Sequence, residues 1–127
     1  MIRTFVDSGV LIAAARGDRD ESEPSMRVLE DPNRRILTSV FVRLEVYPKV
    51  AFPSFPLQRA FMNEFFMDPL IEWERDLDAI VKNALREAET YGLSAMDSLH
   101  VAAALLLDAD QFVTTESTAN RSTQWPI

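Results

Sequence analysis

Residues 94–107 read SAMDSLHVAAALLL, and this stretch does most to decide the fold. Ser94 can cap a helix over residues 95–107, and because that helix is apolar on nearly every face, we expect it to be buried. Asp97 lies in its first turn, where the helix dipole tolerates a negative charge. Residues 111–114 follow as a short strand. A buried helix that leads into a strand is typical of an α/β protein.

Strands and helices alternate along the rest of the chain. Strands are predicted over residues 2–6, 35–38, 70–73 and 111–114. Helices are predicted over residues 10–15, 23–30, 55–67, 77–88 and 95–107, together with one that Ser39 caps, that continues through Glu45 and that Pro48 ends. This alternation requires crossover connections, so it predicts a parallel sheet with helices on both faces. Sites in such folds lie outside the carboxyl ends of the strands.

Length and composition exclude several classes of protein. The 127 residues are predicted to form a single domain, residues 1–127. There is no cysteine, which excludes disulfides, thiolate catalysis, zinc fingers and iron–sulfur ligation. With 3 glycines the chain has no glycine-rich phosphate loop. The longest apolar run, residues 101–107, is too short to cross a bilayer, and we expect a cytoplasmic protein.

The charge balance bears on possible partners. There are 20 acidic and 13 basic residues, and the net charge of −7 argues against binding nucleic acid through a basic face. It does not exclude a nucleic-acid substrate bridged by metal, because bound cations change the local sign.

Four carboxylates occupy informative positions. Asp7 follows the strand over 2–6, Glu116 follows the strand over 111–114, Asp97 opens the buried helix, and Glu45 lies late in the helix that Ser39 caps. Taken singly, each has a structural explanation as a helix cap or a solvated acid. If they converge, two charges 4 Å apart repel by about 4 kcal/mol at an effective dielectric of 20. Such a cluster takes up protons or holds divalent cations, and oxygen ligands favour Mg²⁺ or Mn²⁺.

The chain has one histidine, His100, so it cannot form a metal site with two histidines. It lies one turn after Asp97 on the buried helix. We expect it to be packed in the interior or beside the site, rather than to take a direct part in chemistry.

Four segments in this order resemble the PIN-domain family, in particular its small branch that includes the VapC-type toxins: residues 5–12 (FVDSGVLI), 44–46 (LEV), 95–104 (AMDSLHVAAA) and 113–116 (VTTE). The resemblance spans nearly the whole chain. It implies a three-layer α/β/α, PIN-like fold with a central parallel sheet. It also implies a nuclease that depends on Mg²⁺ or Mn²⁺ and cleaves RNA, as the toxin of a type II toxin–antitoxin pair does.

The resemblance also assigns roles to residues. The catalytic, metal-binding acids of the family map onto Asp7, Glu45, Asp97 and Glu116, the last of which is more often Asp in the family. The hydroxyls of Thr114 and Ser8 are expected beside these ligands.

Partners follow from the same resemblance. Relatives commonly form homodimers, and many are inhibited by a small antitoxin that reaches the acidic groove with a basic side chain. We expect Arg16 and Arg43 near the groove, in contact with an RNA substrate. The aromatic residues of segment 52–57 with Phe61, Phe65 and Phe66 are predicted to belong mainly to the core, with a partner surface as the alternative.

Three other functions are alternatives to this hypothesis. The fold can serve as an RNA- or protein-binding module that has lost activity around Glu116. A metal-dependent DNA nuclease is a closer competitor, because nothing in the sequence reads a 2′-hydroxyl. A phosphoacceptor domain needs a further acid beside Asp7, where Ser8 and Gly9 stand instead.

Overall fold

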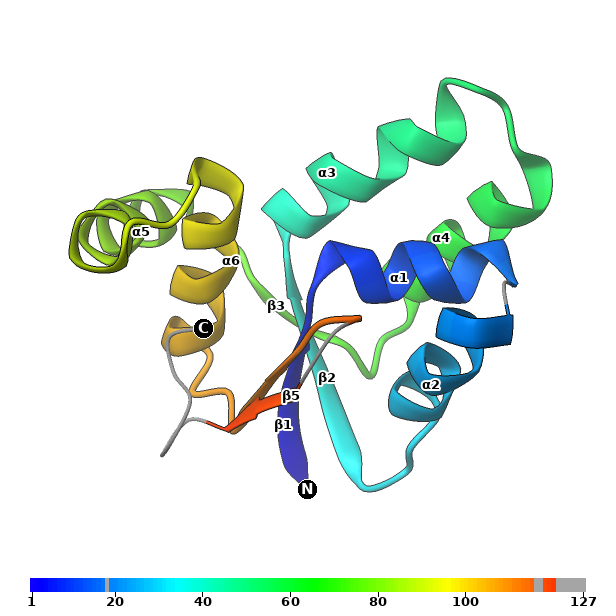
Figure 1. The fold of residues 1–127 in the computed structure, drawn as a ribbon, viewed down its shortest axis with the longest axis horizontal. Helices are drawn as coiled ribbons and strands as arrows, with labels where there is room; N and C mark the ends of the chain where they lie inside the picture. Colours follow the sequence, from blue (N-terminus) through cyan, green and yellow to red (C-terminus); the bar gives the residue numbers. More distant parts are fainter. Residues whose placement is uncertain (18, 116–117, 121–127) are drawn as a thin grey trace.

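The computed structural model describes residues 1–17, 19–115 and 118–120 (Figure 1). The strands are β1 (Ile2–Val6), β2 (Arg34–Ser39), β3 (Glu72–Glu74), β4 (Gln111–Val113) and β5 (Thr118–Asn120). The helices are α1 (Ser8–Arg16), α2 (Arg19–Leu29), α3 (Val40–Ala51), α4 (Pro56–Met67), α5 (Leu77–Tyr91) and α6 (Ala95–Leu106). Over the described residues, no helix combines the length and apolar character that a membrane crossing requires.

The strands form one sheet in the order β3-β2-β1-β4-β5. β1 pairs in parallel with β2 and β4, and β2 pairs in parallel with β3. β5 is antiparallel to β4 and was not expected from the sequence. The predicted parallel sheet is therefore confirmed for four strands. Because β1 and β4 are parallel neighbours, their carboxyl ends meet at one edge of the sheet.

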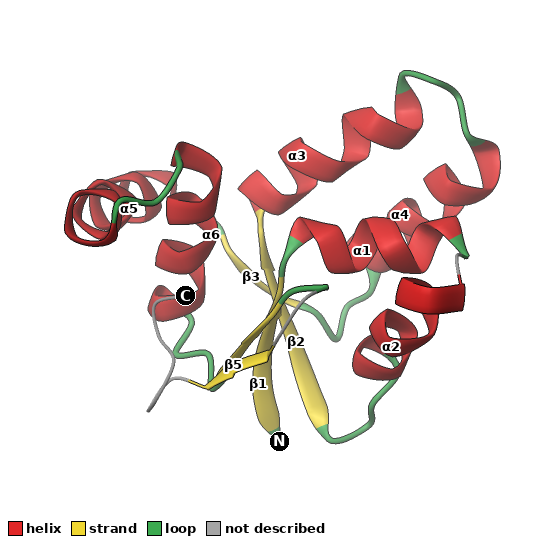
Figure 2. Ribbon diagram, viewed as in Figure 1, coloured by secondary structure: helices red, strands yellow, loops and turns green. Residues whose placement is uncertain are grey.

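Helices cover both faces of this sheet, which makes the predicted three-layer α/β/α fold (Figure 2). α5 and α6 pack together on one side, while α1, α2 and α4 lie on the other. α3 contacts both α1 and α6, so it bridges the two helical layers. The chain enters α3 directly from β2, and this connection places α3 beside the carboxyl edge of the sheet.

The core forms where the sheet meets α6 and α1. Phe5 of β1 stacks on Phe112 of β4 with ring centroids 5.4 Å apart, and both side chains are buried. Three consecutive alanines of α6 are also buried, and their small side chains let the helix approach the sheet closely. The buried helix predicted from residues 94–107 is confirmed in its middle, while Asp97 and Leu106 at its two ends are exposed. The three consecutive buried alanines of α6 are Ala102, Ala103 and Ala104.

Prolines interrupt the helices less than the sequence suggested. Pro48 was expected to end the third helix, but α3 continues to Ala51 with Pro48 inside it. Pro48 has no N–H to bond the carbonyl of Leu44. The Leu44 side chain is exposed, so this part of α3 faces water, and the burial of Val50 in the last turn favours continuation. In the same way α2 begins at Arg19, which places Pro24 inside the helix rather than at its start.

The third strand was predicted over residues 70–73, but β3 comprises Glu72–Glu74. A turn displaces its start: the side chain of Asp68 accepts a hydrogen bond from the Leu70 N–H at 2.9 Å, and the carbonyl of Asp68 accepts one from the Ile71 N–H at 3.2 Å. β3 is then held from β1, because Arg3 donates two hydrogen bonds to the Glu72 carboxylate, at 3.2 and 2.7 Å.

The aromatic segment divides between core and surface. Phe66 is buried against Trp73 and Phe65, with ring centroids 5.6 and 5.1 Å away. Phe61 is partly buried against the same core. Phe52 and Phe55, at the turn between α3 and α4, are exposed. The prediction of core residues is thus right for α4, which turns one face to the sheet, and wrong for the turn before it.

Replacing a core leucine tests this packing. Leu37 in β2 is fully buried, so Leu37→Ala removes apolar contacts and leaves a cavity. We expect it to lower the free energy of unfolding by about 2–5 kcal/mol in urea titrations. The matched control is Leu57→Ala, because Leu57 in α4 is exposed. The control is expected to stay within about 0.5 kcal/mol of the wild type. Equal losses in the two variants would contradict the described core.

Candidate metal centre

Asp7 lies at the junction of β1 and α1. Its backbone N–H donates to the Val113 carbonyl at 2.9 Å, which extends the pairing of β1 with β4 by one residue. Its side chain caps α1 by accepting the Ser8 N–H at 2.8 Å. Asp7 therefore does cap a helix, as the structural explanation held. This hydrogen bond also fixes the carboxylate at the carboxyl edge of the sheet.

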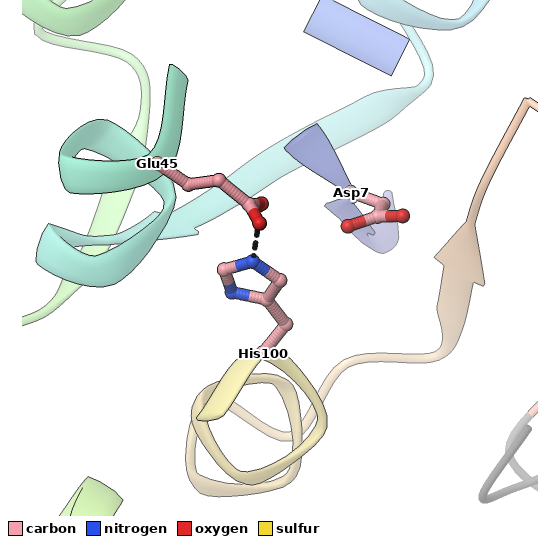
Figure 3. Close-up of side chains that lie close together, drawn as sticks. All are labelled: Asp7, Glu45 and His100. Atoms are coloured by element: carbon pink, nitrogen blue, oxygen red, sulfur yellow. Dashed lines mark hydrogen bonds and ion pairs between the residues drawn. The ribbon is translucent and has the colours of Figure 1, made fainter. Parts of the chain in front are cut away.

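Glu45 and His100 reach the same place from two helices. Figure 3 shows Glu45 extending from α3 toward His100 of α6, with Asp7 beside them. The His100 Nε2 lies 3.0 Å from the Glu45 Oε1. Each of the three residues offers one ligand atom, and these atoms all lie within 4.8 Å of one another. The fold therefore brings together side chains from β1, α3 and α6.

Asp97 stands at the margin of this group. It lies three residues before His100, so both project from the same face of α6. Asp97 is exposed and is not part of the group defined by the 4.8 Å distance, yet its charge still acts on the Asp7 carboxyl. The structure thus joins Asp7 closely with Glu45 and places Asp97 at their edge. Glu116 lies outside the described residues.

The two expected hydroxyl residues lie at different depths. Ser8 is buried, and its hydroxyl donates a hydrogen bond to the Glu45 carboxylate. The hydroxyl oxygen lies 3.4 Å from the Asp7 Oδ1, which accepts the Ser8 N–H. Ser8 therefore links the two carboxylates, and its role beside bound metal stays a prediction. Thr114 directly follows β4 and is partly buried. Its role beside the ligands stays a prediction.

The two arginines lie away from the carboxylates. Arg16 ends α1, so it is separated from Asp7 by the length of that helix, roughly 13 Å at about 1.5 Å per residue. Arg43 is two residues before Glu45 in α3, and helix residues two apart do not share a face. Its guanidinium instead lies over the Tyr47 ring, 5.8 Å from the centroid. Contact of either arginine with a substrate stays a prediction.

A cation that the sequence analysis did not single out is Lys49. It lies four residues after Glu45, on the same face of α3, and its charge acts on the Glu45 carboxyl. The spacing of four residues was a usable signal in the sequence. The contact of His100 with Glu45 had no such signal, because the two residues are 55 positions apart.

The two carboxyls differ in their proton affinity. Burial raises the pKa of Asp7, and the charges of Glu45 and Asp97 add to this, against the opposing effects of His100 and the Ser8 N–H. Burial also acts to raise the pKa of Glu45, but the hydrogen bonds from Ser8 and His100 and the charge of Lys49 outweigh it, so that pKa is lowered. Glu45 is therefore the more firmly ionised of the pair.

This donor set fits a hard divalent cation. Carboxylate oxygens bind Mg²⁺ at about 2.0–2.1 Å and Ca²⁺ at about 2.3–2.6 Å. Two oxygens bound to one Mg²⁺ are at most about 4.2 Å apart. Oxygens of Asp7 and Glu45 lie within 4.8 Å of each other, so a small movement of either side chain lets them share one ion. Two partly buried carboxylates near a third acid also repel one another, and a bound cation relieves that repulsion. The site is an acidic centre at the carboxyl edge of a parallel α/β sheet.

Comparison with known proteins assigns this chain to a family. The model of the PIN domain matches residues 4–121, so the chain belongs to the PIN domain family. A search of curated protein sequences found no significant match.

Solved structures share the fold at low sequence identity. VapC20 of Mycobacterium tuberculosis, a sarcin-ricin loop cleaving toxin, superposes with a TM-score of 0.72 at 14% identity, over 87% of this chain and 88% of that one. A toxin–antitoxin complex from Klebsiella pneumoniae gives 0.66 at 18%, over 87% and 84%. VapBC2 of Rickettsia felis, bound to a DNA fragment from their promoter, gives 0.61 at 18%, over 85% and 84%.

The raised pKa of Asp7 predicts how stability depends on pH. The folded carboxyl binds its proton more tightly than the unfolded one, so stability is lost as the pH rises above the unfolded pKa of about 3.9. Asn cannot ionise but can still accept the capping hydrogen bond. We therefore expect Asp7→Asn, without added metal, to be more stable than the wild type at neutral pH, by on the order of 1 kcal/mol.

Urea titrations from about pH 4 to about pH 8 check this expectation. The difference between Asp7→Asn and the wild type should shrink toward zero as the pH falls. Asp78→Asn is the control, because Asp78 is an exposed acid in the first turn of α5. An advantage for Asp7→Asn that is constant across the pH range would contradict the burial of an ionised Asp7.

Proposed function

We propose that this PIN-domain protein is an endoribonuclease that depends on Mg²⁺ or Mn²⁺ and serves as the toxin of a type II toxin–antitoxin pair. The observation that carries the proposal is the convergence of Asp7 and Glu45, whose oxygens lie within 4.8 Å at the carboxyl edge of the sheet. The PIN domain match supports a nuclease. The structural likeness to a toxin that cleaves the sarcin-ricin loop supports RNA as the substrate.

Asp7 and Glu45 would hold the cation, with Asp97 at their margin as a further ligand, and Glu116 is proposed as the fourth acid from the resemblance to the family. When bound, a divalent cation lowers the pKa of a coordinated water and offsets the negative charge of the phosphodiester that the water attacks. Ser8 would keep the two carboxylates in place, because it donates to both. The low pKa of Glu45 keeps that carboxylate ionised and ready to bind metal at neutral pH.

The charge of the chain makes the cation a condition for substrate binding. The protein carries −7 overall, and the site itself gathers acids, so RNA phosphates are repelled from it in the absence of metal. Lys49 and the more distant Arg16 and Arg43 would supply the remaining contacts to phosphate. We therefore expect modest affinity for RNA in general and a strict requirement for metal.

The proposal includes partners. A small antitoxin protein and a second copy of the chain are the expected partners in the cytoplasm, and the likeness to the toxin–antitoxin complexes of Klebsiella pneumoniae and Rickettsia felis supports the antitoxin. The exposed apolar residues Leu77, Val81 and Leu85 form one stripe of α5, at spacings of four residues. Phe52 and Leu57 add exposed apolar area around the turn before α4.

Cleavage assays test the proposed activity. The purified protein is expected to cut mixed RNA in the presence of Mn²⁺ and to be inactive after chelation. Glu45→Gln and Asp97→Asn should each lower the cleavage rate by about 100-fold or more, because each removes a carboxylate that would hold the cation at the site. Both variants are expected to stay folded, as checked by circular dichroism.

Control variants distinguish loss of an acid at the site from loss of any acidic residue. Glu64→Gln in α4 and Asp78→Asn in α5 remove exposed acids and should keep the wild-type rate. Undiminished cleavage by Asp97→Asn would refute the role of Asp97. Single-stranded DNA and RNA of the same sequence distinguish a ribonuclease from a DNA nuclease. Binding of RNA without cleavage of either would favour the binding module.

Metal binding is also expected to stabilise the fold. A ligand that binds only the folded state adds about 2.7 kcal/mol when its concentration is 100 times its Kd. Mn²⁺ should therefore raise the melting temperature of the wild type but not that of Asp7→Asn or Glu45→Gln. Glu64→Gln should respond like the wild type, because it lies outside the site. A Mn²⁺ effect that survives in Asp7→Asn would place the ion elsewhere.

A further inference from the structure

His100 is almost completely enclosed, with 1% of its side chain exposed. It projects from α6, and its ring lies near Phe5 of β1, with centroids 6.3 Å apart and planes inclined by 39°. The neighbouring α6 residues Val101 and Ala102 are buried as well. Because packing surrounds the ring, rotation of the imidazole to exchange its two nitrogens would require the core to open.

The two ring nitrogens have different surroundings. Nε2 lies 3.0 Å from the Glu45 Oε1, at the distance of a hydrogen bond. Nδ1 is buried and has no hydrogen-bond partner in the described structure. A bare Nε2 would face a carboxylate oxygen lone pair to lone pair, and its tautomer would bury an Nδ1–H without an acceptor, which costs free energy. The arrangement therefore places a proton on Nε2.

A proton on Nε2 prevents this nitrogen from binding a metal ion. Its ligand atom lies near those of Asp7 and Glu45, so direct binding of an ion is the competing possibility. To bind metal through Nε2, the ring would have to lose the hydrogen bond to Glu45. Its proton would then move to Nδ1, where no acceptor is available. Retention of the hydrogen bond avoids both costs.

We infer that His100 is a positioning residue, which donates its Nε2–H to Glu45 Oε1 and keeps this carboxylate turned toward Asp7. The inference rests on the proposed function, because it assigns Glu45 to a metal. Glu has three rotatable side-chain bonds, and ordering it costs entropy when a ligand binds. His100 and Ser8 together order Glu45 before the ion arrives. Donors behind metal ligands commonly change metal affinity by about 10- to 100-fold.

The single histidine permits a direct test by NMR. In protein labelled with ¹⁵N-histidine, the two ring nitrogens of His100 report its tautomer without overlap from other histidines. We expect a protonated Nε2 both before and after addition of Mg²⁺. A bare Nε2 in either state would overturn the inference, and loss of the Nε2 proton on adding Mg²⁺ would identify His100 as a ligand.

Variants test the consequence for metal binding. His100→Phe keeps an aromatic ring near Phe5 but removes the donor, and Mn²⁺ affinity measured by calorimetry should fall by about 10-fold or more. His100→Gln carries an N–H donor and should recover most of that loss. Equal losses in His100→Gln and His100→Phe would contradict positioning.

These measurements separate the inference from the proposed function. If the wild type binds no Mn²⁺, the proposed function fails, and the tautomer without metal still decides whether His100 donates to Glu45. If the wild type binds Mn²⁺ and cleaves RNA while Nε2 carries no proton, the proposed function stands and the inference fails. Urea titration of each variant checks that it is folded under the conditions of the binding measurement.

Discussion

The structure depends on holding two carboxylates, Asp7 and Glu45, side by side in a partly buried place. Their mutual repulsion and the loss of hydration both oppose this arrangement. Hydrogen-bond donors offset the cost unequally. Glu45 accepts from Ser8 and His100, and its pKa is lowered, whereas Asp7 accepts chiefly the Ser8 N–H, and burial leaves its pKa raised. The negative charge of Glu45 is therefore well stabilised by hydrogen bonds, whereas that of Asp7 is not. A divalent cation would supply the missing stabilisation.

The rest of the fold serves to bring these groups together. Parallel pairing of β1 with β4 sets Asp7 at the carboxyl edge of the sheet. The direct connection of β2 to α3 carries Glu45 to the same edge. The buried alanines of α6 let that helix lie close enough for His100 to reach Glu45. A bulky residue at any of these alanines would push α6 away from the sheet and His100 away from Glu45. The geometry of the site therefore depends on the packing of the core.

Much of the fold was predictable, because its signals are local. Ser94 does cap α6, Gly92 does end α5 with a left-handed backbone, and the order of strands and helices follows from hydrophobic periodicity. The errors arose where tertiary contacts override a local rule. Pro48 is tolerated inside α3 because buried residues continue beyond it, and β3 starts late because Asp68 forms a turn. At the site, Asp7 and Asp97 were indicated by their positions at a strand end and a helix start, and Glu45 by the resemblance to the family. Neither Lys49 nor the hydrogen bond of His100 was predicted.

The sequence by itself determined which segments are strands and helices and which acids stand at their ends, because caps, periodicity and breakers act over a few residues. Only the tertiary structure decided which of those acids meet. Glu45 and His100 are 55 positions apart, and no local sequence pattern predicts the hydrogen bond between these residues of α3 and α6. The same holds for Asp97, which shares a helix face with His100 yet remains exposed at the margin. Side-chain proximity depends on how α3 and α6 pack around β1, and that packing is a property of the whole core.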